Sequence, residues 1–388
     1  MQDRTITKAT ILLVGMFSIQ LIGQTRVRSE LDIPDILGYR TLKCDFHMHT
    51  VFSDGDVWPP VRVEESWREG LDVISITDHL EHEHHKDEVL LDHNRAFELA
   101  SSKAEQLDIL LIRGAEITRD MPPGHLNCIF LKDAAPLDTA EWRDAIKAAI
   151  GQDAFVFWNH PGWIRQAPDG VAKWYDEHTE IYENGWMHGI EIVNETQYYP
   201  EVHQWCLEKK LTLFGNSDIH DPINLFFDFA RGEHRAMTLV FATERTESAI
   251  KEALQARRTA VYFKNQLFGD ETYLRPIFEK SIEILNPVVT LEGDHGAYVH
   301  IKNKADIPYE LSTDVDVKDL NVPEEITLYG DKTVLFRVSA EYDSLSGERD
   351  IRIPYTVRNL RITPEEGLSF ELNLHVAFIP AEKEDDKE

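Results

Sequence analysis

Residues 42–49 read LKCDFHMH, a run of strand-forming residues that ends on His47 and His49. Residues two apart on a strand project from the same face, so both imidazoles are expected to point to one place. Imidazole is a common ligand of transition metals. The run therefore predicts a strand whose C-terminal edge carries metal ligands.

Seven more short apolar runs follow before residue 243, with helix-like patterns between them. They occupy residues 72–79, 109–117, 125–131, 154–161, 189–195, 211–220 and 235–242. The runs are continuously apolar, as in a parallel sheet that is covered on both faces. Trp142, Ile146 and Ile150 have the spacing of an amphipathic helix, and another helix is expected after Thr246. This alternation of strands and helices over residues 42–268 predicts an α/β barrel.

Potential metal ligands lie at the ends of these predicted strands. Besides the pair at 47 and 49, they are His79, Glu116, His125, His160, Asp218 and His220. The carboxyl edges of parallel barrel strands converge on one mouth. Burying so many imidazoles and carboxylates there would be strongly unfavourable without cations. The set lacks a thiolate, so it suits zinc, manganese or iron.

Beyond about residue 270, strand-like runs continue without helical partners. Apolar and polar residues alternate from residue 370 to residue 378, which is the period of a half-buried antiparallel strand. All eight tryptophans lie before residue 206, which supports a domain boundary. We predict a linker at residues 25–41, a small all-β sandwich at 275–380 and a charged tail at 381–388.

The chain is strongly acidic, with 40 basic and 69 acidic residues and a formal charge of -29. This excess argues against a nucleic-acid surface, because nothing in the sequence forms a basic stripe. An anionic small-molecule substrate would therefore need locally bound cations. The composition leaves the oligomeric state open.

The N-terminus has the pattern of a secretory signal peptide. Arg4 and Lys8 precede an uncharged run at residues 9–23, and polar residues follow the run. An uncleaved membrane anchor is the alternative, but the run is shorter than the roughly 20 apolar residues that span a bilayer. We predict a signal peptide at residues 1–24, an exported protein in the periplasm or secreted, and no stable membrane span after cleavage.

Six motifs in this order resemble those of the polymerase and histidinol phosphatase (PHP) family. They are DFHMHTVFSDG (45–55), ITDH (76–79), GAEIT (114–118), GHLN (124–127), NHP (159–161) and NSDIH (216–220). The resemblance covers about residues 42–263. It implies a distorted seven-stranded (βα) barrel, a phosphoesterase activity and two or three divalent metal ions.

The family pattern also implies which residues hold which ion. His47, His49, Glu116 and Asp218 would hold the first ion, Glu116, His125 and His160 the second, and Asp54, His79 and His220 the third. Some members have a histidine where this chain has Asp54, so the occupancy of the third site is open. A hydroxide between the first two ions would attack phosphorus. The third ion, or His79 or His220 in its place, would help the leaving oxygen depart.

Two arginines and an aromatic segment are candidates for binding the substrate. Arg119 and Arg165 follow predicted strands, where a guanidinium can clamp a phosphate, although a plain surface role is an equal alternative. Residues 162–188 carry five aromatic rings, including Trp163 and Trp186. They are expected to form an apolar wall for the substrate, and the alternative is that they pack against the barrel.

The sequence thus predicts hydrolysis of small organic phosphate monoesters or diesters. Two alternatives stay open: a carboxylic or carbamate ester hydrolase on the same metal site, and a catalytically silent metal-binding module. All nine ligand positions are filled in this chain, which favours an active enzyme over a silent module.

Overall fold

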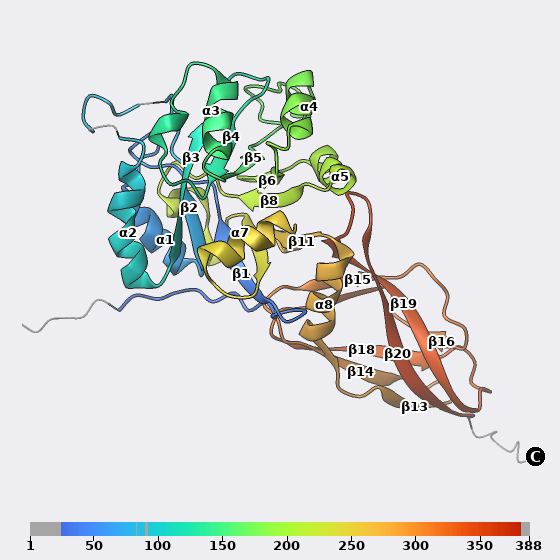
Figure 1. Cartoon of the computed structure of the whole chain (residues 1–388). Helices are drawn as coiled ribbons and strands as arrows, with labels where there is room; N and C mark the ends of the chain where they lie inside the picture. Colours follow the sequence, from blue (N-terminus) through green and yellow to red (C-terminus); the bar gives the residue numbers. More distant parts are fainter. Residues whose placement is uncertain (1–24, 83, 90–91, 382–388) are drawn as a thin grey trace, which may run out of the picture.

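The computed structural model describes residues 25–82, 84–89 and 92–381, and Figure 1 shows two joined parts in it. The predicted signal peptide, residues 1–24, lies outside the described residues, as do residues 382–388 of the predicted tail. Within the described part of the chain, no helix is both long enough and apolar enough to cross a bilayer.

Seven strands form the wall of the N-terminal part. They are β1 (Arg40–Asp45), β2 (Val73–Ile76), β3 (Leu110–Ile117), β4 (Leu126–Ile129), β5 (Phe155–Trp158), β6 (Gly189–Asn194) and β8 (Thr212–Asn216). Strands β1 to β6 pair in chain order, and β8 pairs with β6. The wall closes where the segments after β1 and β8 meet, because Met48 and Ile219 form a parallel bridge. The predicted α/β barrel is therefore confirmed, and burial on both faces explains the continuously apolar runs.

Two strands run against the predicted parallel direction. Strand β4 is antiparallel to both β3 and β5, and β9 (Met237–Ala242) is antiparallel to β1. The expectation of an all-parallel sheet is wrong at these strands. Only residues 118–125 connect β3 to β4, and a parallel return needs a crossover of a dozen residues or more. The chain therefore turns back on itself at this point.

Helices cover the outside of this wall (Figure 1). They are α1 (Pro59–Arg68), α2 (Arg95–Leu107), α3 (Trp142–Ile150), α4 (Asp176–Glu183), α5 (Pro200–Lys209) and α7 (Glu247–Gln255), with the short turns η1 (Ala135–Leu137), α6 (Ile223–Phe226) and η2 (Phe229–Arg231). Helix α3 buries Ile146, as its predicted stripe requires. The hydroxyl of Thr246 caps α7 by accepting a backbone N–H at 3.3 Å, and α7 buries Ile250 and Leu254. Both predicted helices are confirmed.

The C-terminal part is all β after one helix. It contains α8 (Glu271–Ser281), β12 (Ile282–Ile284), β13 (Val288–Glu292), β14 (Ala297–Asn303), β15 (Tyr309–Ser312), β16 (Leu320–Asn321), β17 (Glu325–Leu328), β18 (Thr333–Ala340), β19 (Gly347–Arg361) and β20 (Gly367–Ile379). One sheet has the order β12-β14-β18-β16, and the other contains β13, β20, β19, β15 and β17. Leu372, Leu374, Val376 and Phe378 of β20 are buried between exposed or half-buried neighbours. The predicted all-β domain and its alternating strand are confirmed.

The two parts share one continuous sheet. Strands β10 (Thr259–Phe263) and β11 (Gln266–Gly269) extend the barrel sheet from β9, and β11 pairs in parallel with β19. The buried amide of Asn359 donates to the carbonyls of Asn265 and Pro308, both at 2.7 Å. The small hairpin strand β7 (Gln197–Tyr198) pairs with β6. The exact limits of the domains stay a prediction.

A buried histidine near the start of α4 must be uncharged to make its contacts. His178 accepts the N–H of Tyr175 at its Nδ1 (3.1 Å) and donates from Nε2 to the carbonyl of Pro123 (2.8 Å). Its ring stacks on Trp158 with centroids 3.8 Å apart. Burial lowers the pKa of His178 to about 4, and the contact with Pro123 opposes this only in part.

The free energy of unfolding should therefore fall as the pH decreases from about 6.5 to about 4. In this window the unfolded chain takes up a proton at His178 and the folded chain does not, which is worth about 3 kcal/mol for this residue. Urea unfolding at pH 7 and pH 4.5 would measure the fall. It should be smaller in the His178→Gln variant, and equal falls in both proteins would contradict the prediction.

Candidate metal centre

The nine predicted metal ligands lie together at one end of the seven-stranded wall. His47 and His49 follow β1, Asp54 lies in the next loop, His79 follows β2, Glu116 is in β3, His125 precedes β4, His160 follows β5, and Asp218 and His220 follow β8. His125 reaches this end from the start of its strand because β4 is antiparallel. Seven of the nine are buried, whereas the side chains of Asp54 and His220 are 30% and 33% exposed. The outer side of the cluster is therefore the one that meets solvent.

Four of these residues form a compact inner group. The Nε2 atom of His47 lies 3.0 Å from Asp218 Oδ1 and 3.0 Å from Glu116 Oε2. The Nε2 atom of His49 lies 3.0 Å and 3.2 Å from the same two oxygens. The two imidazole nitrogens are themselves 3.0 Å apart. Two nitrogens and two carboxylate oxygens that face one point are the donor set expected around a divalent cation.

Glu116 lies between two sets of imidazoles. Its Oε2 atom faces the inner group, whereas Oε1 lies 2.7 Å from His125 Nδ1 and 3.8 Å from His160 Nε2. The backbone holds this arrangement, because Glu116 and His79 form a parallel bridge at the ends of β3 and β2. A carboxylate with one oxygen directed to each side has the geometry of a bridging ligand.

A third, outer group lies on the side that is open to solvent. Asp54 Oδ1 is 3.2 Å from His220 Nε2 and 3.5 Å from His79 Nε2. One ligand atom of each of these residues and of His49 lies within 4.8 Å of the others. The ring of His49 stacks against that of His220 and against that of His79, with centroids 4.1 Å and 4.4 Å away. His49 therefore adjoins both the inner and the outer group, which the sequence did not indicate.

The charges in the cluster compensate one another through protons on the imidazoles. Burial lowers the pKa of His49, but hydrogen bonds to Asp218 and Glu116 outweigh it and raise the pKa to about 10. Burial raises the pKa of Glu116, yet His79 and His47 hold it well below its ordinary value. The carboxylates are therefore ionised, and the protonated imidazoles of His47 and His49, whose pKa values are raised, balance them. Divalent cations can take the place of these protons.

His160 has contacts that suit a metal ligand better than a hydrogen-bonded side chain. It is buried, its Nδ1 atom has no hydrogen-bond partner, and its Nε2 atom lies 3.8 Å from Glu116 and 3.9 Å from Asp218. Ligand atoms around one ion are about 3 to 4 Å apart, because each bond is about 2 Å long. The backbone of His160 is also left-handed, with φ of 29°, and such strain in a non-glycine residue is typical of functional sites. The residues present thus fit divalent ions.

Two carboxylates that support the cluster were missed from the sequence. Glu191 of β6 is fully buried, and its Oε1 atom accepts from His47 Nδ1 at 2.8 Å. Asp78 accepts the N–H and the hydroxyl of Thr50 at 2.6 and 2.7 Å, which holds the loop that leads to Asp54. The signal for Glu191 is present in the sequence, because it is a lone carboxylate inside the apolar run GIEIVNE. A buried charge of this kind needs partners.

Two of the four predicted substrate-binding residues lie beside the cluster. The ring of Trp163 is 5.6 Å from that of His125 and 5.3 Å from that of His160. The guanidinium of Arg165 is exposed and lies over Trp163, 5.4 Å from its ring centre. This pair therefore offers a cation and an aromatic face next to the ligands of the second predicted ion.

The other two lie in different surroundings. Trp186 packs against the hydrophobic core, with Lys147 of α3 5.9 Å from its ring. Arg119 forms an ion pair with Glu81 and donates to the carbonyl of Thr139 at 2.6 Å. The expectation that Trp186 contacts the substrate therefore needs correction, because its ring packs against the core. For Arg119 it stays a prediction, because its partner Glu81 lies near Asp54.

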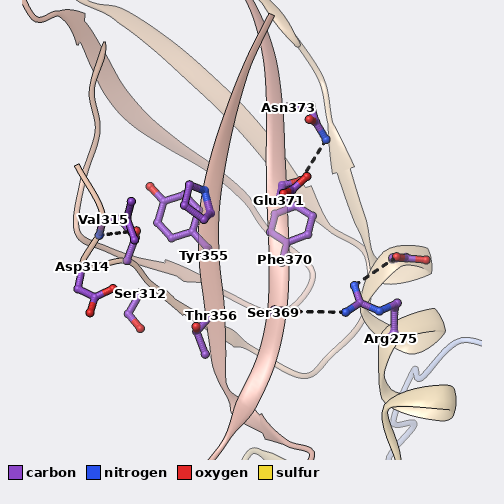
Figure 2. A pocket seen from close by; sticks show the side chains of 13 residues that line it. Arg275, Ser312, Asp314, Val315, Tyr355, Thr356, Ser369, Phe370, Glu371 and Asn373 are labelled. Carbon is purple, nitrogen blue, oxygen red and sulfur yellow. Dashed lines mark hydrogen bonds and ion pairs between the residues drawn. The ribbon is translucent and has the colours of Figure 1, made fainter. Parts of the chain in front are cut away.

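A hollow of about 380 Å³ lies beside the outer group. It is lined by Asp54, Glu81, His82 and His84. A larger hollow of about 660 Å³ lies on the sandwich, as Figure 2 shows, between α8 and the strands that carry Tyr355 and Phe370. In the described ranges of the chain, no candidate group of metal ligands borders this second hollow. The candidate groups of metal ligands among the described residues therefore all lie at the barrel mouth.

Comparison with known proteins agrees with this division. A family model described as an Ig-like domain matches residues 282–373. The crystal structure of a two-domain protein from Bacteroides vulgatus, which contains a predicted PHP-like metal-dependent phosphoesterase, is similar to this chain at 47% identity and a TM-score of 0.85. The match covers 90% of this chain and 100% of that one. An uncharacterized protein of Methanocaldococcus jannaschii is 26% identical over 204 residues, which are 48% of this chain and 85% of that protein.

Proposed function

The chain belongs to the family of PHP-like metal-dependent phosphoesterases, and from that premise we propose that it hydrolyses small organic phosphate esters at the barrel mouth. The observation that carries the proposal is the position of Glu116, whose two oxygens face different sets of imidazoles. Such a carboxylate would help to hold two divalent ions, which would supply the charge stabilisation that an in-line displacement at phosphorus needs. Monoesters and diesters are both within the proposed substrate class.

The residues divide into three proposed ion sites. His47, His49, Glu116 and Asp218 would hold the first ion, Glu116, His125 and His160 the second, and Asp54, His79 and His220 the third. The donors suit zinc, manganese or iron, since all are imidazole or carboxylate groups. When bound, the ions supply a water of lowered pKa and neutralise charge on the phosphoryl oxygens.

His79 and His220 are the proposed residues for the leaving group. The Nδ1–H of His220 donates to the carbonyl of Asp218 at 2.8 Å, so its Nε2 atom faces Asp54 at the solvent side. His79 is fixed from behind by Thr118, whose hydroxyl lies 2.5 Å from its Nδ1 atom. Each Nε2 atom can therefore bind a third ion or hold a proton near the leaving oxygen.

Arg165 and Trp163 are proposed to bind the substrate. The protein carries a formal charge of -29, so an exposed guanidinium beside the metal ligands is a local attraction for a phosphate. Trp163 offers its ring to an apolar or aromatic leaving group. The metals would perform the chemistry, and this pair would select the ester.

Replacing Trp163 with alanine should lower kcat/KM for an aromatic phosphate ester about tenfold more than for methyl phosphate. The ring contact is worth about 1.4 kcal/mol, which corresponds to a factor of ten, and only the aromatic ester can make it. Trp186→Ala is the matched control, because that ring packs against the core beside Lys147. Metal content should stay the same in both variants. An equal loss on both substrates in Trp163→Ala would make its ring a packing residue.

The test of the proposed function is a screen of the metal-reconstituted protein. Phosphomonoesters, phosphodiesters and carboxylic or carbamate esters are offered in parallel, and bound metal is measured in the same samples. Release of inorganic phosphate or of an alcohol from a phosphate ester supports the proposal. Turnover of carboxylic esters alone, or metal binding without any turnover, would replace it with an ester hydrolase or with a silent metal-binding module.

A further inference from the structure

Glu191 is a buried carboxylate that accepts four hydrogen bonds. Its Oε1 atom accepts from His47 Nδ1 at 2.8 Å and from the amide of Asn216 at 2.9 Å. Its Oε2 atom accepts from the backbone N–H of His160 at 2.8 Å and from the amide of Asn194 at 2.9 Å. The residue is fully buried in β6, so water does not reach it.

The neighbours of Glu191 determine which way each donor points. The amide oxygen of Asn216 accepts the N–H of Phe46 at 2.9 Å, which turns its NH₂ group toward Glu191. The NH₂ group of Asn194 lies between Glu191 and the carboxylate of Asp218, at 2.9 and 3.3 Å. An ionised carboxylate only accepts hydrogen bonds and has room for about four of them. Four donors with no acceptor among them therefore match a carboxylate and no other side chain of its shape.

This arrangement decides which nitrogen of His47 is free. Since Glu191 can only accept, His47 keeps a proton on Nδ1, and its Nε2 atom faces Glu116 and Asp218 at 3.0 Å. The same carboxylate holds the backbone of His160, where φ is 29°, and reaches Asp218 through Asn194. One ligand atom each of His47, His160 and Asp218 lies within 4.8 Å of the others.

We propose that Glu191 is a positioning residue that aligns His47 and Asp218 for the first ion and His160 for the second, without binding either ion itself. Each of its two oxygens already accepts two hydrogen bonds, so neither oxygen is left to bind an ion. A carboxylate behind a histidine ligand orients the ring and increases its basicity. The inference rests on the metal centre of the proposed function and adds a residue to it.

The experiment measures the affinity of the full-length protein for zinc and for cobalt, with the metal alone as the probe. Glu191→Gln has the same shape, but its NH₂ group must face two of the four donors. We expect this variant to have an affinity about 10- to 100-fold lower for one of the ions and a changed visible spectrum of the cobalt protein. Asn194→Ala removes one of the four donors to Glu191 and with it the link to Asp218, so it should weaken the binding of the same ion less than Glu191→Gln does.

Two comparisons separate positioning from a general loss of stability. Asn359→Ala removes a buried amide at the junction with the sandwich, so it should lower stability and leave metal affinity and spectrum unchanged. In a His47→Ala background, Glu191→Gln should have a smaller effect on metal affinity than in the wild type, because the part of its action that passes through His47 is already lost. If Glu191→Gln does not fold, the affinity of Asn194→Ala decides the question.

Wild-type affinity in both Glu191→Gln and Asn194→Ala would overturn the inference, as would full additivity of Glu191→Gln with His47→Ala. In those cases the wild-type protein still binds metal, and the proposed function stands. A wild-type protein that binds no divalent ion would instead overturn the proposed function. The two failures are therefore distinguishable in one set of titrations.

Discussion

Replacing Glu116 with alanine is expected to abolish hydrolysis, with a loss on the order of 10³-fold or more. Its two oxygens face His47 and His49 on one side and His125 and His160 on the other. Without this carboxylate both proposed ions lose a ligand, and the imidazoles around it lose the charge that holds them together. Cooperative loss of at least two ions should follow, because the two sites share the residue.

The measurement pairs metal content with turnover of the best substrate from the screen. Glu98→Ala is the matched control, because the Glu98 side chain is 50% exposed on α2 and, among the described residues, pairs only with Arg95 on the helix surface. It should retain full metal and full activity. Wild-type metal content in Glu116→Ala would show that the bridging assignment is wrong, even if activity were lost.

Removal of the metal with a chelator should abolish activity and also lower the free energy of unfolding by several kcal/mol. An ion that binds only the folded protein contributes about 4 kcal/mol when its free concentration is about 1,000 times its Kd. Metal-free protein must instead keep Glu116 and Asp218 buried against protonated imidazoles. Urea unfolding at fixed free zinc, with and without chelator, measures the difference.

The stabilisation by metal should increase with pH. The pKa of His49 is raised to about 10, so the folded metal-free protein gains stability from this proton below about pH 6.5 and loses it as the pH rises through 10. A cation must displace the same proton, which becomes easier as the pH rises. Glu116→Ala should show little stabilisation at any pH. An unfolding midpoint that is the same with and without chelator in the wild type would contradict the prediction.

Much of the barrel could be predicted because its signals are local. Each buried strand is a continuous apolar run, and each helix has its own apolar stripe, such as the one that places Ile146 in the core. The direction of β4 was mistaken because an apolar run looks the same in a parallel and an antiparallel strand. The short connection at residues 118–125 contained the missing information.

The aromatic segment after β5 shows where composition fails. Residues 162–188 contain five rings, and by sequence all are equivalent candidates for a substrate wall. The structure places Trp163 against His125 and His160, whereas Trp174 and Trp186 pack against the core of the barrel. Which side of a loop a ring faces depends on contacts with distant residues, so its own neighbours in the chain do not reveal it.

The sequence by itself determined the kind of chemistry. It contains the nine imidazoles and carboxylates, and their positions at the ends of apolar runs can be read from it directly. The tertiary structure alone decided how these side chains are grouped. It directed one oxygen of Glu116 to each side, placed His49 between two groups, and put the carboxylate of Glu191 behind His47 from a strand 144 residues away. Ligand identity is a property of single residues, whereas the direction of a lone pair depends on strand pairing and on packing between residues that are remote in sequence.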